Sequence, residues 1–296
     1  MTSTPAGGRL PDAGDLSAVV ITRNASRRLA DVLAAVEFCA ERLVLDSGST
    51  DDTVAIARAA GARVEFQPFL GYGPQKRRAV DLAAHDWILS IDADEVLDDE
   101  ARRAARDAPR DDPAACYAFR RRTFVGRREI KHGAWSDDRV VRLFNRRTAA
   151  FKPLQVHEEV EAARPPVLLP GTILHYSYES LGDVLARPLR YAPLKAAVMR
   201  GKGQAAGLLT MPFRGLAAFT RSYLIRGGWR DGAAGFVIAL ARVIESTLPR
   251  AMLLEGEPAG ESSAAQPADL DRSAASIRSM SAGSAAESMS RSPDAG

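Results

Sequence analysis

The chain has 296 residues, of which 46% are hydrophobic and 26% charged, a composition typical of a soluble globular protein with one large domain or two small ones. Its 40 basic and 37 acidic residues give a net charge of only +3, so the charge does not indicate a nucleic-acid partner. The sequence has no apolar run near the roughly 18 residues of a membrane-spanning helix, no signal-peptide core at its start and only two cysteines, Cys39 and Cys116, which together predict a cytoplasmic location.

Composition also divides the chain into segments. Residues 1–15 are predicted to form a flexible leader. Residues 257–296 are about half Ala and Ser and contain no aromatic residue, so they cannot bury enough apolar surface to fold and are predicted to be a disordered tail. Between these ends we expect an α/β domain over residues 16–180 and a helical extension over residues 181–256.

In the first hundred residues, predicted strands alternate with predicted helices. Strands are expected at residues 17–22, 42–48, 63–66 and 87–91, which are short apolar runs. The segments between them carry helical patterns, such as the apolar spacing of Leu29, Val32, Leu33 and Val36, and residues 76–84 are expected to be helical as well. This alternation predicts right-handed crossovers and a mostly parallel sheet with helices on both faces.

The expected sheet predicts where a ligand binds. In open parallel sheets, ligands bind beyond the carboxyl ends of the strands, where the strand order reverses. With a 3-2-1-4 order, the reversal lies between the first and fourth strands. Their carboxyl ends carry Thr22-Arg23-Asn24 and Asp92-Ala93-Asp94, so these residues are expected at the ligand crevice.

The acidic run after the fourth strand has two explanations. Asp98, Asp99 and Glu100 precede the helical pattern ARRAARDA, where negative charge suits a helix N-terminus. Asp92 and Asp94 instead end a buried strand, where two neighbouring carboxylates repel unless a cation or hydrogen-bond donors compensate them. A divalent Mg²⁺ or Mn²⁺ ion shared with substrate phosphates is the expected partner. Phosphatases that form an aspartyl-phosphate place such a motif after their first strand, so that alternative is rejected.

Several motifs in order resemble a known family. The segments VVITRN, LVLDSGSTDDT, GYGPQKRRAVDLA and DWILSIDADE resemble the nucleotide-sugar domain of family 2 glycosyltransferases, and more narrowly the bacterial branch with lipopolysaccharide-core β-glucosyltransferases. RRTFVGRREIKHGAW, RLFNRR, VHEEV, LHYSYESL and RGGWRDGAAGF extend the resemblance to about residues 16–250. It implies the GT-A fold, an α/β Rossmann-like domain with a donor part near residues 16–100 and an acceptor part near residues 101–180.

The resemblance also implies site residues. It assigns the nucleotide-sugar pocket to Thr22, Arg23, Asn24, Asp46, Ser47, Gly48, Lys76 and Asp92. Asp46 would accept a hydrogen bond from the base, and Lys76 would contact phosphate. Asp92 would face the ribose or the sugar, and Asp94, with Asp92, would hold the metal ion. Relatives commonly have Asn where this chain has Arg77, so Arg77 either adds a phosphate contact or is solvated.

The catalytic base is expected in VHEEV, residues 156–160. Successive side chains of a strand point to opposite faces, so Glu158 and Glu159 cannot both point into the cleft. The resemblance favours Glu158 as the base, with His157 beside it. The alternative is that these residues face solvent.

The sequence allows two interpretations for each of two histidines and one tryptophan. His132 in KHGAW either lies in the cleft or is an ordinary hydrogen-bonded histidine, and the same alternatives apply to His175 in LHYSY. Trp135 either stacks on a sugar or fills the core. No His spacing typical of a zinc hydrolase is present.

Residues 186–250 mix Arg and Lys with Phe, Tyr, Trp and Leu at near-helical intervals. Such helices either lie on an anionic membrane surface or pack on the catalytic domain with a solvated basic face; the resemblance favours peripheral membrane association. Gly227-Gly228 and Asp231-Gly232 are expected to form a turn between helices.

These features together predict a metal-dependent, inverting glycosyltransferase. It would move a sugar from a UDP-sugar, with UDP-glucose as one candidate, to a cell-envelope glycan or glycolipid. The alternatives are a sugar-phosphate nucleotidyltransferase, against which the chain has no Gly-rich phosphate loop after the first strand, and a non-catalytic sugar- or lipid-binding protein with the same fold.

Overall fold

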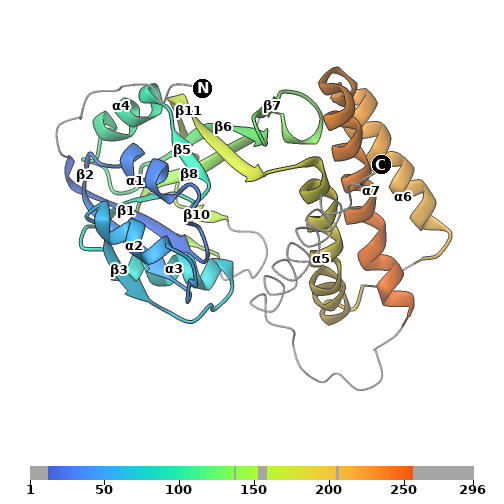
Figure 1. The fold of residues 1–296 in the computed structure, drawn as a ribbon, viewed down its shortest axis with the longest axis horizontal. Coiled ribbons are helices and arrows are strands. Elements are labelled where there is room, and N and C mark those ends of the chain that lie inside the picture. Colours follow the sequence, from blue (N-terminus) through green and yellow to red (C-terminus); the bar gives the residue numbers. More distant parts are fainter. Residues whose placement is uncertain (1–12, 137, 153–158, 205–206, 256–296) are drawn as a thin grey trace, which may run out of the picture. The chain divides into compact units, whose positions relative to one another are not determined.

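The computed structural model describes residues 13–136, 138–152, 159–204 and 207–255. Strands and helices alternate in its first part (Figure 1). These elements are β1 Ala13–Thr22, α1 Leu29–Ala35, β2 Cys39–Asp46, α2 Thr53–Ala59, β3 Arg63–Phe66, α3 Tyr72–Leu82 and β4 Trp87–Ser90. The predicted strands are therefore confirmed, and β1 begins earlier than expected, at Ala13 inside the predicted leader.

Residues 95–178 add an antiparallel half to the sheet. The elements are β5 Glu95–Leu97, α4 Asp99–Asp107, β6 Cys116–Val125, β7 Arg128–Ile130, η1 Gly133–Trp135, β8 Asp138–Asn145, β9 Ala149–Phe151, β10 Val160–Ala162 and β11 Val167–Tyr178. The strand order is β3-β2-β1-β4-β8-β6-β11-β5. The predicted 3-2-1-4 order and its parallel pairing are confirmed, whereas β8 pairs antiparallel with both β4 and β6.

The sheet is covered on both faces because its parallel strands are apolar at successive positions. Val20 and Leu89 point into one core cluster with residues of α1, α2 and α4. Val19 and Ile88, one position away in the same strands, point into a second cluster with residues of α3 and β9. This alternation is the pleat of a strand buried on both sides, as the sequence predicted.

Helix α4 confirms the interpretation of the later acids. Asp98 is its N-cap, and its side chain accepts a hydrogen bond from the backbone N–H of Ala101 at 2.8 Å. Asp99 lies in the first turn and pairs with Arg102 at 3.3 Å. These carboxylates stabilise the positive end of the helix, so they belong to the fold rather than to a ligand site.

Strand β11 brings the end of the domain back beside its middle. It pairs in parallel with β6 and antiparallel with β5, with His175 opposite Glu95. Gly171 in β11 has φ +85°, and a Cβ there would stand 2.1 Å from the backbone nitrogen of Ala101. Only glycine fits this close approach, which keeps β11 against the start of α4.

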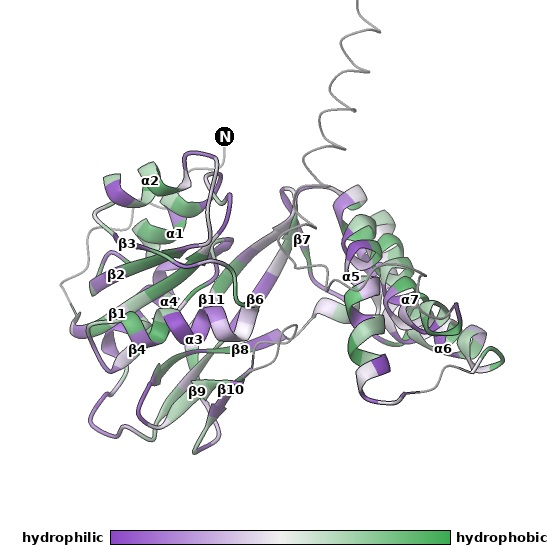
Figure 2. Cartoon of the chain, turned by 90° about the horizontal axis from the view of Figure 1, so that it is seen from below, coloured by the Kyte–Doolittle hydropathy of each residue, from purple (hydrophilic) through white to green (hydrophobic). Residues whose placement is uncertain are grey.

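The C-terminal elements are helical: α5 Leu181–Gly201, α6 Thr210–Phe219, η2 Thr220–Ile225, η3 Gly228–Asp231 and α7 Gly232–Leu254. These helices carry both hydrophobic and hydrophilic residues (Figure 2). Gly227 and Gly232 both have positive φ and flank η3, which confirms the predicted turn. Among the described helices, none is both long and apolar enough to cross a membrane.

The chain divides into two compact units. One contains the residues up to Leu185 together with Leu216–Val243, and the other contains Ala186–Gly215 and the residues from Ile244 onward. The first unit has its own third core cluster, in which Val125 and Ile130 pack with Val184 of α5 and Ile238 of α7. The boundary between the units therefore passes through helices of the predicted extension. The predicted tail, residues 257–296, lies outside the described residues.

Candidate active site

The loop after β2 is organised by Asp46. This residue is 4% exposed, and its carboxylate accepts four hydrogen bonds: from the Thr22 hydroxyl (3.0 Å), the Gly48 and Ser49 backbone N–H groups (2.9 and 2.8 Å) and the Ser49 hydroxyl (2.5 Å). All four donors are neutral. Gly48 takes φ +88°, which lets the backbone turn its N–H toward the carboxylate. Asp46 thus fixes the end of β1 and the loop of β2 in one arrangement.

The loop after β1 is tied to the same structure. Asn24 adopts φ +51°, the left-handed conformation that Asn tolerates better than most residues. Its backbone N–H donates to the Ser49 hydroxyl at 2.9 Å, and its side-chain oxygen accepts from the Thr50 N–H at 2.8 Å. Next to it, the Arg23 Nε is buried and has no hydrogen-bond partner among the described residues. A buried donor of this kind is suited to a ligand oxygen.

Helix α3 links these loops to the acids after β4. Gln75 is fully buried, and its amide donates to the Ser47 hydroxyl at 3.0 Å. Lys76 is 2% exposed, and its Nζ lies 2.5 Å from Asp92 Oδ1. Arg77 points elsewhere and donates to the Phe151 carbonyl at 2.7 Å. Because Gln75 and Lys76 are neighbours, one turn of α3 contacts both the loop after β2 and the turn after β4.

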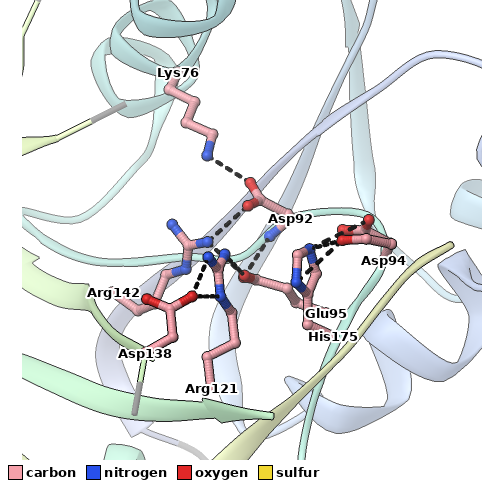
Figure 3. Close-up of polar contacts among 9 residues, drawn as sticks. Lys76, Asp92, Asp94, Glu95, Arg121, Asp138, Arg142 and His175 are labelled. Atoms are coloured by element: carbon pink, nitrogen blue, oxygen red, sulfur yellow. Dashed lines mark hydrogen bonds and ion pairs between the residues drawn. The ribbon is translucent and has the colours of Figure 1, made fainter. Parts of the chain in front are cut away.

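Asp92 lies between two cations (Figure 3). Opposite Lys76, its Oδ2 accepts from Arg142 of β8 at 2.6 Å, and Arg142 is 5% exposed. Burial alone would raise the pKa of Asp92, but the charges of Arg142 and Lys76 outweigh it and hold that pKa well below its usual range. The carboxylate is therefore ionised at any physiological pH.

The network continues into the antiparallel half of the sheet. Arg142 also donates to Glu95 Oε1 at 2.6 Å, and Arg121 of β6 donates to the same oxygen at 3.0 Å. Arg121 in turn donates to Asp138 at 2.9 and 2.5 Å. Lys76, Arg121 and Arg142 thus face Asp92, Glu95 and Asp138, three positive against three negative side chains.

Asp94 points to the other side of the turn, toward His175 (Figure 3). His175 Nε2 lies 3.5 Å from Asp94 Oδ2, and the Asp94 side chain is 39% exposed. Within the described ranges there is no cluster of three or more His, Cys, Asp or Glu side chains that could hold a metal ion. Mg²⁺ commonly takes one or two carboxylates and completes its shell with water and substrate phosphates. The accessible carboxylate of Asp94, with His175 beside it, fits an ion bound in that way.

Most predicted site residues meet at this edge of the sheet. Asn24 and Thr22 contact the loop that Asp46 organises, Ser47 contacts Gln75, and Lys76 contacts Asp92. The predicted base Glu158 and its neighbour His157 lie outside the described residues.

His132 and Trp135 have protein partners instead. The backbone N–H of His132 donates to Asp231 at 2.8 Å, and its Nδ1 lies 3.1 Å from the same carboxylate. Trp135 stacks on Tyr178 with ring centroids 5.0 Å apart. The core interpretation of Trp135 and the hydrogen-bonded interpretation of His132 are therefore the ones that the structure favours.

Sequence reasoning missed Glu95, Arg121, Arg142 and Asp138. Glu95 directly follows the two predicted acids, and Arg142 begins the RLFNRR motif, so both stood in segments already singled out. Their partnership depends on β8 pairing with β4 and β6, which alternation of strands and helices does not predict.

Comparisons with known proteins give the family. Residues 17–164 match the model of the family described as Glycosyl transferase family 2. The chain is 28% identical to the lipopolysaccharide core biosynthesis glycosyltransferase LpsC of Rhizobium meliloti, over 81% of this chain and 92% of that protein. It is 29% identical to an uncharacterized glycosyltransferase of Rickettsia conorii, over 82% of this chain and 92% of that protein.

A solved structure overlaps in part. It is glucosyl-3-phosphoglycerate synthase of Mycobacterium tuberculosis, with 26% identity and a TM-score of 0.31 over 39% of this chain and 46% of that one. This overlap is too small for any property of that enzyme to be carried over. The family match, by contrast, spans half of the chain and contains both strand-end motifs, and it confirms the expected α/β GT-A fold. The chain belongs to glycosyl transferase family 2.

Proposed function

We propose that this glycosyltransferase is an inverting enzyme that moves a sugar from a UDP-sugar, with UDP-glucose as one candidate donor, to a cell-envelope glycan or glycolipid. The observation that carries the proposal is the pair of strand-end acids: Asp92 held by Lys76 and Arg142, and Asp94 half-exposed beside His175. The similarity to LpsC over most of both chains supports an envelope acceptor.

The two acids have different roles in this proposal. Asp92 already has two cationic partners within 2.6 Å, which favours a role as a fixed acceptor for hydroxyl groups of the ribose or sugar over metal ligation. Lys76 stands at the same point and supplies positive charge near the donor phosphates. Arg23, with its buried Nε, and the loop of Ser47 and Gly48 line the nucleotide side.

Asp94 is the proposed metal ligand, with His175 as its neighbour. A bound Mg²⁺ or Mn²⁺ ion would neutralise the charge that develops on the departing diphosphate. The chain's own contribution is to place the ligand: the Asp94 carbonyl accepts from the Tyr176 N–H at 2.9 Å, which fixes the turn against β11. The side chain is thereby held at the crevice, where the diphosphate is expected.

Glu158 is the proposed base, and its neighbour supports the choice. Glu159 is 67% exposed and pairs with Lys152 at 2.7 Å, so it is engaged at the surface. This pairing at the surface leaves Glu158, which the resemblance favours, as the proposed base, with His157 next to it in the sequence. The base would take the proton of the acceptor hydroxyl.

A calorimetric titration tests the donor site. UDP and UDP-glucose are titrated into wild-type protein with and without Mn²⁺, and into Asp94→Asn. We expect metal-dependent binding of UDP that Asp94→Asn weakens at least tenfold, since the loss of a ligand or its support typically costs about 10–100-fold in metal affinity. Absence of UDP binding under every metal condition would contradict the proposal and favour a non-catalytic binding protein. Turnover of a sugar phosphate with a nucleoside triphosphate would favour the nucleotidyltransferase instead.

A surface of η2 and η3 supports peripheral membrane association. Leu224, Ile225 and Trp229 are 56%, 76% and 54% exposed, and we call them the apolar corner. Arg221, Arg226 and Arg230, which lie before, between and after them in the sequence, are also exposed, and residues 184–230 contain no Asp or Glu. Apolar side chains interleaved with cations are complementary to the headgroup region of an anionic membrane. Such a contact would bring the enzyme to a lipid-linked acceptor.

Vesicle co-sedimentation tests this surface. Wild-type protein should pellet with phosphatidylglycerol vesicles and much less with phosphatidylcholine, and the binding should fall at about 1 M NaCl, where the Debye length is about 3 Å. Ile225→Glu should lower the bound fraction severalfold. Val167→Glu is the control, because Val167 is also apolar and 55% exposed in the same unit but lies on β11. Equal loss in both variants would contradict a role for the apolar corner.

A further inference from the structure

Glu95 is a buried charge one position after Asp94. It is 0% exposed, and both of its carboxylate oxygens are used. Oε1 accepts from Arg142 at 2.6 Å and from Arg121 at 3.0 Å, and Oε2 accepts from the backbone N–H of Asp92 at 3.2 Å. A carboxylate this deep is tolerated only with such partners.

The contacts of Glu95 close the turn that carries both acids. Its own backbone N–H donates to the Asp92 carbonyl at 3.0 Å, while its side chain receives the Asp92 N–H. The segment from Asp92 to Glu95 is therefore closed by two reciprocal hydrogen bonds. Asp94 lies inside this closed segment, so its direction toward His175 depends on the closure.

Glu95 also fixes the cation that faces Asp92. The same Arg142 nitrogen reaches Glu95 Oε1 and Asp92 Oδ2, each at 2.6 Å. Arg121 approaches Glu95 from β6 and is itself held by Asp138. Glutamine at position 95 would keep the shape but remove one of three negative charges, leaving three cations against two carboxylates. Arg142 would then be drawn more strongly to Asp92. The amide has only one acceptor oxygen, so it could accept either from the two arginines or from the Asp92 N–H, but not from both sides.

We propose that Glu95 is a positioning residue of the transfer reaction: it locks the turn from Asp92 to Glu95 so that Asp92 faces the donor and Asp94 stands beside His175. The D-x-D motif of this chain then functions as a D-x-D-E unit. The inference rests on the proposed donor site, and it concerns geometry, since Glu95 is too deeply buried to touch a substrate.

Glu41 provides a matched control. It too is a glutamate with a mostly buried side chain (12% exposed), and it accepts from the Ser17 hydroxyl (2.5 Å), the Ala84 N–H (2.6 Å) and Arg63 (2.7 Å). It lies near the amino end of β2, whereas the site lies at the carboxyl ends of the strands. Glu41→Gln should therefore lower stability without affecting the site.

The experiment measures Mn²⁺ affinity by electron paramagnetic resonance, and UDP affinity by calorimetry, in wild type, Glu95→Gln and Glu41→Gln. We expect Glu95→Gln to weaken Mn²⁺ binding in the presence of UDP by about 10–100-fold, with wild-type secondary structure by circular dichroism, and Glu41→Gln to change it less than about twofold. Wild-type affinities in Glu95→Gln, or an equal loss in Glu41→Gln, would overturn the inference. Wild-type protein that binds neither UDP nor Mn²⁺ would instead overturn the proposed donor site.

Arg121→Lys is a second test of the inference, to be used if Glu95→Gln does not fold. Arg121 donates to Glu95 at 3.0 Å and to Asp138 at 2.9 and 2.5 Å, so it supports Glu95 from the side of β6. Lys at position 121 has a single ammonium group and cannot reproduce the contacts of Arg121 with both Glu95 and Asp138. If Glu95 positions the turn, this loss should weaken Mn²⁺ binding severalfold. Unchanged Mn²⁺ and UDP affinities in folded Arg121→Lys would overturn the inference.

Discussion

The ends of β2 and β4 each place an aspartate at the same edge of the sheet, yet the two carboxylates are stabilised differently. Asp46 accepts hydrogen bonds from neutral hydroxyl and backbone N–H donors, three of which belong to Gly48 and Ser49, two and three positions after it. Asp92 is held by Lys76 and Arg142, which come from a helix and a distant strand. The first arrangement is a local loop, and the second exists only once the sheet is complete.

The difference has consequences for what each region tolerates. Neutral donors can be lost one at a time, each at the modest cost of a hydrogen bond. Charges in a buried network depend on one another, because removing one partner leaves another charge buried without compensation. We therefore expect substitutions in the turn after β4 to be more damaging than substitutions in the loop after β2.

Arg142→Met should have the largest effect. It keeps most of the side-chain volume but removes the nitrogen shared by Asp92 and Glu95. Glu95 would keep only Arg121 as a counterion, in a fully buried position. Breaking a buried ion pair in this way costs about 3–5 kcal/mol, which denaturant unfolding would detect as a large fall in the free energy of unfolding.

Arg147→Met is the control for that measurement. Arg147 pairs with Asp86 at 2.6 Å, but its side chain is 74% exposed, and exposed pairs contribute roughly 0–1 kcal/mol. If the two variants lost similar stability, the network around Asp92 would be no more cooperative than a surface pair, and the contrast between the two regions would fail.

The same contrast explains how much the sequence could predict. The strands follow from short apolar runs separated by helical patterns, and the helix N-terminus at Asp98 follows from acids before ARRAARDA; each signal lies within a few residues. The 3-2-1-4 order comes instead from the usual arrangement of such sheets. The family resemblance indicated the loop of Asp46, Ser47 and Gly48, in which the Gly48 and Ser49 N–H groups donate to Asp46 only two and three residues away.

Contacts between distant strands could not be predicted. Arg142 meets Asp92 because β8 enters the sheet antiparallel beside β4, and His132 meets Asp231 across 99 positions of the chain. Local patterns identify charged residues but do not pair them, since the pairing depends on strand order and register. For that reason the sequence identified Asp92, Asp94 and Lys76, and missed the two arginines and the glutamate that complete their network.

Substitution of Asp46 should have an intermediate effect that depends on the new residue. Asp46→Ala removes the acceptor of four hydrogen bonds, two of them from the part-buried N–H groups of Gly48 and Ser49, which should cost about 1–3 kcal/mol. Asp46→Asn should cost less than half as much, because its oxygen can face these N–H groups while the Thr22 and Ser49 hydroxyls, which also accept hydrogen bonds, face its NH₂ group. Unfolding of both variants in denaturant measures the difference. Equal costs would show that the charge of Asp46 matters more than its acceptors.

Asp51 should show the smallest effect and a defined dependence on pH. Its carboxylate accepts from the Ser26 N–H at 3.2 Å and from the N–H (3.1 Å) and hydroxyl of Thr53. Partial burial acts to raise the pKa of Asp51, but the hydrogen bonds from Thr53 and Ser26 outweigh it and lower that pKa. Asp51→Ala should therefore cost about 0.5–1.5 kcal/mol at pH 7.

The sign of the pH dependence follows from the lowered pKa. Because the folded protein holds Asp51 ionised below its unfolded pKa of about 3.9, the stabilisation is complete above roughly pH 4 and is lost as the pH falls through the folded value. The difference in unfolding free energy between wild type and Asp51→Ala should thus be constant from pH 7 to pH 5 and should narrow toward pH 3. A difference that widened in acid would mean that the neutral carboxyl is the better partner of Ser26 and Thr53, and the loop after β2 would not be organised around ionised aspartates.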